Sequence, residues 1–440
     1  MRQKLQALEE SAKPIRVSLI GCGRFGSMIA AQLSKTPGIT LSVACDKNLQ
    51  RSHYALNLAG FPADIITGAD SVSKGNNALR RGCVVATDNI DVAVELDVDV
   101  VIEATGVPDL GALHCFKAIE NQKHVVNVSV EADVLVGPEL KRIADDVGVV
   151  YSLAYGDQPA IIDDLYDWAV SIGFEVVAAG KGTKYLPSYR HSTPDTALQH
   201  FGYSAEEAVA SGLNTRMYNS FVDGTKSAIE MCSVANMTGL IPDLPGMHFP
   251  AASIADLPQL LRPKSKGGIL SRSGVVEVVS NIARDGVEIP NSIRWGVYIV
   301  ITSDSPYLLR CLKEYGLAMD DTSTYGLMYR PYHLVGMEVP ISIAKAFLYN
   351  ESTGTPVAKV AEVAATSKKV LAPGETLDGE GGYTVYGTLL EAAQAVDKQL
   401  VPIGLCRGAK VKTHIGLDSM ITEADVDLPS SEFIDKLIAR

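Results

Sequence analysis

Three glycines near the amino terminus constrain the fold of this chain more than any other feature. Residues 17–20 favour a buried strand, and residues 28–33 are typical of a helix. Between them Gly21, Gly23 and Gly26 form the pattern G-x-G-x-x-G, which is informative only in such a strand-to-helix context. The first glycine permits a tight turn, the second lets a pyrophosphate approach the backbone, and the third lets helix and strand pack closely. We therefore expect a dinucleotide-binding turn at a helix N-terminus, although a glycine-rich turn without a ligand is the alternative.

The next expected strand, residues 40–45, ends at an acidic residue. Asp46 follows the glycines by about 20 positions, where a carboxylate can bind a ribose hydroxyl. That carboxylate would repel a 2′-phosphate, which favours NAD over NADP. Lys47 and Arg51 are close enough in sequence to accommodate NADP, so both coenzymes stay open.

Strands and helices alternate through the first third of the chain, which predicts a parallel sheet with helices on both faces. Ligands bind such sheets at the carboxyl ends of the strands. The residues expected there or in the glycine turn are Gly21, Cys22, Gly23, Arg24, Phe25, Gly26, Asp46, Lys47, Arg51, Ala104, Thr105, Gly106, Val130 and Glu131. The polar stretch 64–82 is predicted to be an insertion or a mobile loop.

Length and composition predict how many domains the chain forms and which partners and compartment it has. A chain of 440 residues is expected to form two or three domains, and a net charge of −12 argues against a nucleic-acid partner. The seven cysteines are scattered and form no C-x-x-C pair, which indicates buried thiols in a reducing compartment. No apolar run is long enough to span a membrane, and the amino terminus lacks the apolar segment of a signal peptide. We therefore expect a cytoplasmic protein without a membrane partner.

An apolar strand over residues 174–180 leads into the densest polar cluster of the chain. Lys181 and Lys184 come first, and Tyr185, Arg190 and His191 follow. A lysine whose pKa burial has lowered can polarise a carbonyl or carry the proton of an alcohol. The alternative is a lysine at the domain rim that is paired with a carboxylate.

A single long helix is predicted over residues 217–238. Asn219, Asp223, Lys226 and Glu230 are spaced so that they share one face of it, and the rest of the helix is largely apolar. A polar stripe on a buried helix must be paired or must line a cavity, although surface pairs at this spacing are common.

Two further segments stand out. The loop 263–268 is predicted to be flexible and basic, so that Lys266, with Arg272 beyond it, could close on an anion, unless the loop is merely solvated. From about residue 353, short strands with Gly and Pro turns suggest a compact β-rich module.

Several motifs occur in one order along nearly the whole chain. Together they resemble the deoxyxylulose-phosphate-reductoisomerase-like (DRL) oxidoreductases, whose cofactor domain is homoserine-dehydrogenase-like, and the tail resembles an SAF domain. The motifs are residues 20–26, 103–108, 127–133, 179–182, 193–195, 223–226, 268–274 and 330–334. The resemblance implies an α/β fold with a Rossmann-like, doubly wound parallel sheet over residues 1–155. It further implies an α+β catalytic and oligomerisation domain over 156–352 and an SAF-like domain over 353–440.

The resemblance also implies an NAD(P)-dependent oxidoreductase for a small polyhydroxylated carbonyl compound, such as a sugar phosphate or sugar acid, with reduction coupled to isomerisation in the reductoisomerase type. The predicted catalytic residues are Lys181, Lys184, Asp157, Asp223, Lys226 and Glu131, and the predicted substrate contacts are Glu230, Tyr185, Arg190, His191, Lys266 and Arg272. The alternatives are a simple dehydrogenase of the homoserine-dehydrogenase type and a non-catalytic NAD(P)-bound sensor. A homo-oligomer is expected.

Two departures from the family pattern limit what it implies. Gly156-Asp157 is followed by Gln158 where the reductoisomerase-like form has Glu, and the segment after Lys181-Gly182 also differs. Carboxylates could hold a divalent metal for an isomerising mechanism. Because Gln158 removes one charged ligand, the sequence favours a site without metal. The substrate itself is left open.

Overall fold

The chain forms two compact units in a computed structural model that describes residues 1–204, 206–207 and 213–438. Unit 1 comprises Met1–Ala160, Leu334–Pro356 and Glu432–Arg440, of which the last two residues are not described. Unit 2 comprises Ile161–His333 and Val357–Ser431. The three domains expected from the sequence stay a prediction, because this division follows other boundaries.

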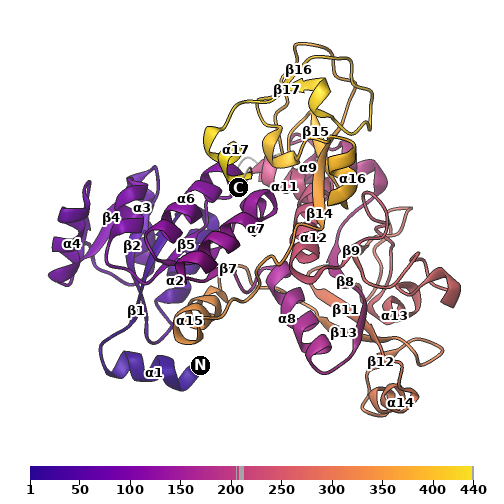
Figure 1. Ribbon diagram of the computed structural model, residues 1–440, viewed down its shortest axis with the longest axis horizontal. Coiled ribbons are helices and arrows are strands. Elements are labelled where there is room, and N and C mark those ends of the chain that lie inside the picture. The colour runs from indigo at the N-terminus through magenta and orange to yellow at the C-terminus, as the bar shows by residue number, and fades with distance from the viewer. Residues whose placement is uncertain (205, 208–212, 439–440) are drawn as a thin grey trace. The chain divides into compact units, whose positions relative to one another are not determined.

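Unit 1 is built on a seven-stranded sheet in which all paired neighbours are parallel (Figure 1). The strand order is β3-β4-β2-β1-β5-β6-β7, so the order reverses between β1 and β5, where doubly wound sheets bind ligands. The Rossmann-like fold expected from the sequence is confirmed. The strands are β1 (Ile15–Ile20), β2 (Ile39–Cys45), β3 (Ile66–Gly68), β4 (Val84–Thr87), β5 (Val100–Glu103), β6 (His124–Asn127) and β7 (Tyr151–Leu153).

Helices complete unit 1. On one side, Ile29 and Leu33 of α2, Leu56 of α3 and Ile343 of α15 pack in one apolar core with the sheet. Residue 343 comes from the segment after residue 333, so a late part of the chain completes the first fold. The helices are α1 (Arg2–Glu10), α2 (Arg24–Leu33), α3 (Leu49–Leu58), α4 (Val72–Arg80), α5 (Ile90–Glu95), α6 (Pro108–Glu120), α7 (Val130–Val147), α15 (Val339–Tyr349) and α17 (Glu432–Ile438).

The prediction of an insertion or mobile loop over residues 64–82 was wrong. The segment forms a 3-10 turn (Ala63–Ile65), the edge strand β3 and helix α4. Ile66 pairs with Val84 in parallel register, and a Cβ on Gly75 would lie 2.6 Å from the Leu96 side chain, so α4 packs closely on the domain. The segment is polar because it covers an edge of the sheet, where one face of α4 meets solvent.

Unit 2 contains a mixed six-stranded sheet in the order β12-β13-β11-β8-β10-β9. The long strand β8 is parallel to β10 and antiparallel to β11, so it lies in the middle of the sheet with partners on both sides. The strands are β8 (Glu175–Thr183), β9 (Ile241–Pro242), β10 (Val275–Ser280), β11 (Val297–Thr302), β12 (Ala318–Met319) and β13 (Gly326–Arg330). The helices are α9 (Ala197–His200), α11 (Thr215–Val222), α12 (Thr225–Thr238), α13 (Leu257–Leu260) and α14 (Pro306–Glu314), and α8 (Gln158–Ser171) crosses from unit 1.

The carboxyl-terminal part of unit 2 is rich in short strands. Its elements are β14 (Ala361–Ser367), β15 (Val385–Glu391), α16 (Ala392–Asp397), β16 (Lys410–Val411) and β17 (Val426–Asp427). Helix α12 packs against β14 and β15: Thr225 Oγ1 accepts a hydrogen bond from Gly387 N at 2.8 Å, and Asn236 Oδ1 accepts one from Val360 N at 2.8 Å. This segment therefore belongs to the same compact unit as the strand that carries Lys181.

No helix in the described part of the chain is both long enough and apolar enough to cross a membrane.

Candidate active site

The glycine turn of unit 1 has the shape that a dinucleotide requires. Gly21 has φ +91°, and a Cβ there would lie 2.7 Å from the Ala104 carbonyl group. A Cβ on Gly26 would lie 2.0 Å from the Gly21 oxygen. Gly23 differs, since a Cβ there would meet no atom within 4 Å, and no side chain caps the helix α2 that it precedes. The protein itself does not need a glycine at position 23, so the open space in front of the helix fits a pyrophosphate.

Asp46 lies beside this turn, as predicted. Its Oδ2 accepts a hydrogen bond from Cys22 N at 2.9 Å, and its Oδ1 accepts one from Asn48 N at 2.9 Å. The carboxylate thus joins the end of β2 to the glycine loop. Lys47 and Arg51 follow it in exposed positions, so the question of NAD or NADP stays open. Arg24 and Phe25 follow Gly23 as the first two residues of α2. Arg24 is exposed and Phe25 is half-buried.

Sequence reasoning missed a buried carboxylate at the end of β5, the strand next to β1 at the point where the strand order reverses. This carboxylate is the centre of a hydrogen-bond network. Glu103, at the end of β5, is fully buried and accepts hydrogen bonds from the hydroxyls of Thr105 and Ser129. Thr105 N donates to the same carboxylate at 3.1 Å, and Gly106 N donates to Ser129 Oγ at 2.9 Å. The network holds the predicted coenzyme residues of this loop in one conformation. A charged residue inside an apolar strand was the signal for it.

Glu131 and Asp157 also lie at the carboxyl edge of the unit 1 sheet. Val130 begins α7 after β6 and Glu131 stands in its first turn, whereas Asp157 follows β7 and accepts a hydrogen bond from Gln158 N at 2.8 Å. In the described residues, no group of three or more His, Cys, Asp or Glu side chains is placed to hold a metal ion.

In unit 2, two glycines place Lys181 on the central strand β8. A Cβ on Gly180 would lie 1.7 Å from the Glu277 oxygen, and one on Gly182 would lie 2.1 Å from the Ile293 oxygen. Neither position accepts a side chain without a backbone shift. The glycines therefore allow neighbouring backbone to close around Lys181, whose side chain is 8% exposed.

Lys181 forms a buried ion pair with Glu230 of α12. Its Nζ contacts Glu230 Oε2, and Nζ of Lys226 lies 4.0 Å from Oε1 of the same carboxylate. Burial alone would raise the pKa of Glu230, but the two ammonium groups and the Lys181 hydrogen bond outweigh it and lower that pKa. The structure thus brings together three predicted site residues from two elements.

The prediction of one helix over residues 217–238 was wrong, and the break separates its polar residues. α11 ends at Val222, Gly224 has φ +89°, and α12 starts at Thr225. Asp223 Oδ1 accepts a hydrogen bond from Thr225 N at 2.8 Å, which stabilises the corner. Asp223 is 1% exposed and lies in another environment from Lys226 and Glu230.

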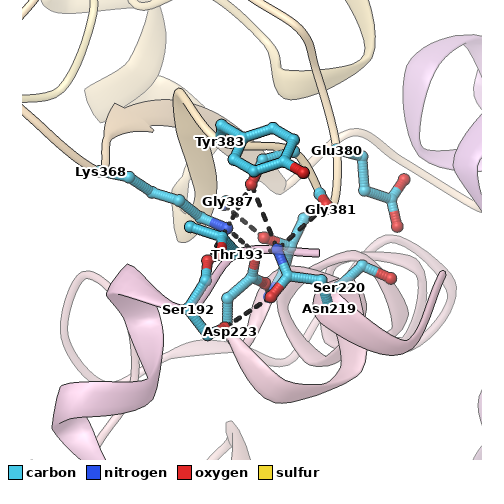
Figure 2. A network of polar contacts seen from close by, with 12 residues as sticks. Ser192, Thr193, Asn219, Ser220, Asp223, Lys368, Glu380, Gly381, Tyr383 and Gly387 are labelled. Atoms are coloured by element: carbon cyan, nitrogen blue, oxygen red, sulfur yellow. Dashed lines mark hydrogen bonds and ion pairs between the residues drawn. The ribbon is translucent and has the colours of Figure 1, made fainter. Parts of the chain in front are cut away.

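Asp223 is paired with a lysine from the carboxyl-terminal segment (Figure 2). Lys368 Nζ donates to Asp223 Oδ2 at 2.6 Å, to Ser192 O at 2.8 Å and to Gly382 O at 2.9 Å. These contacts use all three ammonium hydrogens. Asn219 Nδ2 also donates to the oxygens of Ser192 and Gly382, which ties the same segments together. This geometry explains Asp223 as part of a structural network and gives no support to its predicted catalytic role.

We predict that Lys368→Met destabilises the protein by about 3–5 kcal/mol, because it leaves the Asp223 charge buried and unpaired. The neighbouring Lys369→Met is the matched control: Lys369 is 50% exposed and pairs with Glu375 at the surface, where the loss is about 0–1 kcal/mol. Urea unfolding measures both. The double variant Lys368→Met, Asp223→Asn should recover much of the loss, and equal effects of the two lysine variants would contradict this interpretation.

The predicted substrate residues after β8 lie near two side chains that sequence reasoning missed, the tyrosine Tyr386 and the aspartate Asp418. Tyr185 is buried, and its hydroxyl lies 3.4 Å from Arg190 Nη2. His191 Nε2 lies 2.8 Å from Asp418 Oδ1, which also accepts a hydrogen bond from the Tyr386 hydroxyl at 3.0 Å. Tyr386 and Asp418 come from the carboxyl-terminal segment, so only the tertiary structure places them here.

The remaining predicted residues lie apart from this group. Lys184 is half-buried and, in the described residues, makes no hydrogen bond or ion pair with Glu230. Lys266 is exposed in a short 3-10 turn (Lys264–Lys266), and Arg272 pairs with Glu391 at 3.0 Å. The loop predicted to be flexible is closed by a hydrogen bond from Lys264 N to Leu270 O at 2.7 Å.

Sequence reasoning also missed a second buried glutamate. It holds the loop whose phenylalanine ring packs on Tyr185. Glu277 of β10 is fully buried and accepts hydrogen bonds from His248 N at 3.0 Å and from Phe249 N at 3.2 Å. Met247 and Phe249 have positive φ, a conformation that costs energy for residues other than glycine. The Phe249 ring stacks on Tyr185 with centroids 4.1 Å apart. Glu277 therefore holds a strained loop against a predicted substrate residue.

Burial raises the pKa of Glu277 from its usual 4.5 to about 7, although the backbone N–H donors partly oppose the shift. The folded protein then retains a proton that the unfolded chain has lost between pH 4.5 and 7. Stability from this group is complete below pH 4.5 and is lost as the pH rises to 7, by about 3 kcal/mol. Urea unfolding of Glu277→Gln across this range should lack that component. A pH dependence identical to that of the unsubstituted protein would contradict the prediction, and Glu314→Gln, at an exposed carboxylate, is the control.

Two family models match the chain, one mostly within unit 2 and one within unit 1. Residues 156–339 match the family described as Oxidoreductase DRL, catalytic domain, and residues 21–151 match Homoserine dehydrogenase, NAD binding domain. The chain therefore contains a catalytic domain of the DRL oxidoreductase type and an NAD-binding domain of the homoserine dehydrogenase type. The DRL catalytic match contains Lys181, Lys226 and Glu230, and the NAD-binding match contains the glycine turn and Asp46. Neither match reaches the carboxyl-terminal segment, whose likeness to an SAF domain stays a prediction.

Solved structures give more distant likenesses. The 3-ketoreductase KijD10 from Actinomadura kijaniata, in complex with NADP, is 19% identical over 40% of this chain, with a TM-score of 0.24. This chain spans about half of that protein (50%). Scyllo-inositol dehydrogenase from Lactobacillus casei, with NAD(H) and scyllo-inositol, is 13% identical over 78% of this chain and 92% of its own, with a TM-score of 0.39. A DOX-P reductoisomerase with fosmidomycin and magnesium is 14% identical over 52% of this chain and 58% of its own, with a TM-score of 0.35. No curated protein matches the chain.

Proposed function

We propose that this DRL oxidoreductase uses NAD(H) or NADP(H) to reduce or oxidise a small hydroxylated carbonyl compound that bears a phosphate or a carboxylate. The observation that carries the proposal is the buried Lys181–Glu230 ion pair within the DRL catalytic match. The bound coenzyme supplies or accepts the hydride. Gly21, Gly23, Gly26 and Asp46 would hold it in unit 1, as the glycine turn and the open space at Gly23 favour.

The side chains of the protein stabilise charge at the substrate oxygen and transfer protons to and from it. The Lys181 ammonium polarises a carbonyl and gives it a proton, and in the reverse direction the amine takes the proton of the alcohol. Glu230 keeps the Lys181 side chain in place and compensates its charge. Burial makes this electrostatic contribution larger than it would be in water.

The coupling of this reaction to isomerisation is a further proposal, for which the order of the family motifs is the support. Preference for NAD rests on Asp46, and a homo-oligomer is also proposed. A dehydrogenase of the homoserine-dehydrogenase type is the second candidate, favoured by the match of residues 21–151.

The test follows the absorbance of NADH and NADPH with panels of sugar phosphates, sugar acids and homoserine. We expect turnover with at least one phosphate- or carboxylate-bearing compound and a lower KM for NADH than for NADPH. Tight coenzyme binding by calorimetry without turnover in any panel would favour a sensor and would overturn the proposed reaction. Comparison of each panel with and without EDTA measures whether a divalent metal takes part.

A further inference from the structure

Arg190 carries a positive charge that no carboxylate in the described part of the chain neutralises. Its only hydrogen bond there runs from Nη2 to the Tyr185 hydroxyl at 3.4 Å, and it forms no ion pair. Its Nε–H is buried and has no hydrogen-bond partner. The side chain is half-buried, and arginine is rarely buried unless its charge is paired. The remaining N–H donors of this guanidinium therefore lack a protein acceptor.

The Tyr185 hydroxyl also has an unused donor. Tyr185 is 5% exposed, and its hydroxyl oxygen accepts the hydrogen bond from Arg190. Among the residues that the structure describes, no acceptor takes the hydrogen of this hydroxyl. A buried tyrosine hydroxyl usually finds such a partner. Burial raises the pKa of Tyr185, which keeps the hydrogen in place. Two adjacent side chains thus lack acceptors, and an oxyanion would supply them.

The nearby carboxylate of Asp418 is held by other partners. Its Oδ1 accepts a hydrogen bond from the Tyr386 hydroxyl at 3.0 Å and lies 2.8 Å from His191 Nε2. Tyr386 also supports the arginine, since Arg190 Cζ lies 5.9 Å from the centre of the Tyr386 ring. The face of an aromatic ring attracts a guanidinium without using its N–H donors. These contacts position Arg190 and leave its donors for a ligand.

The segment that carries Arg190 is fixed by the network of Lys368. Arg190 belongs to a 3-10 turn over Pro187–His191, and Ser192 follows directly. The carbonyl oxygen of Ser192 accepts hydrogen bonds from Lys368 Nζ at 2.8 Å and from Asn219 Nδ2 at 3.2 Å (Figure 2). Because both donors are buried, the backbone beside Arg190 is held rigidly.

Tyr185 connects this pair of side chains with the elements of the Lys181 site. It follows β8, the strand of Lys181, by two residues. A Cβ on Gly224 would lie 3.3 Å from Cε2 of the Tyr185 ring, and Gly224 is the residue from which α12 starts. Helix α12 carries Glu230, the partner of Lys181. The two elements that form the buried ion pair therefore also position Tyr185.

We propose that Arg190 and Tyr185 bind the phosphate or carboxylate group of the substrate, an inference that rests on the proposed function and assigns the anionic group to a site. The guanidinium donates to two oxygens of the group, a geometry that suits phosphate and carboxylate alike, and the Tyr185 hydroxyl donates to one of them. The group is distant from the reacting carbonyl, so these contacts are equal in the ground state and the transition state. They lower KM and leave kcat unchanged.

The kinetic test uses Arg190→Met and an anionic substrate. We expect KM to rise about 10–150-fold with kcat retained, because charge-assisted hydrogen bonds are lost. A neutral analogue, with a hydroxyl in place of the anionic group, should be turned over equally well by Arg190→Met and the unsubstituted protein, which also shows that the variant folds. Arg190→Lys retains the charge without the fork and should fall between the two.

Arg310→Met is the matched control for Arg190→Met. Arg310 is 62% exposed and also lies over a tyrosine ring, that of Tyr307, at 5.1 Å. We expect this variant to retain the KM of the unsubstituted protein. An unchanged KM in Arg190→Met, or an equal loss of activity toward the neutral analogue, overturns the proposal.

A binding measurement without substrate or coenzyme separates this inference from the proposed reaction. Proton–nitrogen NMR follows the arginine Nε–H signals, and the Arg190 signal is the one absent from Arg190→Met. It should shift saturably with inorganic phosphate or with acetate, and the anion that shifts it names the group. An equal shift of the Arg310 signal means unspecific contact and overturns the site, as does no shift with either anion. A saturable shift in a protein that turns over no compound overturns the proposed reaction and leaves the anion site.

Discussion

Lys181→Met is expected to lower kcat by about 10²–10⁴-fold with the affinity for the coenzyme unchanged. Methionine has a similar shape but no charge, so the substrate oxygen loses both its electrostatic partner and its proton donor. Stopped-flow or steady-state absorbance of NADH measures the rate, and calorimetry measures coenzyme affinity. Lys398→Met, at an exposed lysine of unit 2, is the control and should retain full activity. A normal rate in Lys181→Met would remove this residue from the mechanism.

Loss of the lysine also leaves Glu230 buried without its hydrogen-bonded ion-pair partner, with Lys226 Nζ 4.0 Å from Oε1. The variant should therefore lose stability, by up to about 3–5 kcal/mol. The double variant Lys181→Met, Glu230→Gln removes both charges and separates the two effects: stability should recover much of the loss, and kcat should not. Recovery of activity together with stability would mean that Lys181 acts only through the fold.

Gly23→Ala should weaken coenzyme binding by about 5–150-fold while the free energy of unfolding changes little. The new Cβ would meet no protein atom within 4 Å and would enter the space that a pyrophosphate requires. Titration by calorimetry or by NADH fluorescence measures the affinity. Gly68→Ala is the matched control, since a Cβ there also meets open space but lies on the edge strand β3.

Gly26→Ala gives the contrasting result. Its Cβ would lie 2.0 Å from the Gly21 oxygen, so the backbone must move and both stability and binding should fall. If Gly23→Ala bound the coenzyme as tightly as the unsubstituted protein, the crevice at the glycine turn would not be the coenzyme site.

Sequence reasoning was reliable where the chemistry is local. The strand, the glycine spacing and the acid at Asp46 are set by neighbours along the chain, and the structure places Asp46 against Cys22 in the same turn. Periodicity also predicted the alternating strands of unit 1. The polar stretch 64–82 was misread because an edge strand and a half-exposed helix have the composition of a loop.

Glu103 and Glu277 show why buried acids were missed. Each stands in an apolar strand and is stabilised by partners that fold toward it: Ser129 in the first case and the backbone of Phe249 in the second. The strand pattern shows an isolated charge but not the donors that make its burial possible.

The sequence by itself determined the doubly wound sheet, its glycine turn and the position of Lys181 directly after an apolar stretch. Each of these depends on spacing within a short segment. Only the tertiary structure decided which carboxylates are available for chemistry. Gly224 breaks the expected helix, and Lys368, 145 residues away, takes Asp223 into a buried ion pair. Lys181 is left with Glu230. Pairing between distant charges depends on where the folded backbone brings them, and no local pattern in the chain records that distance.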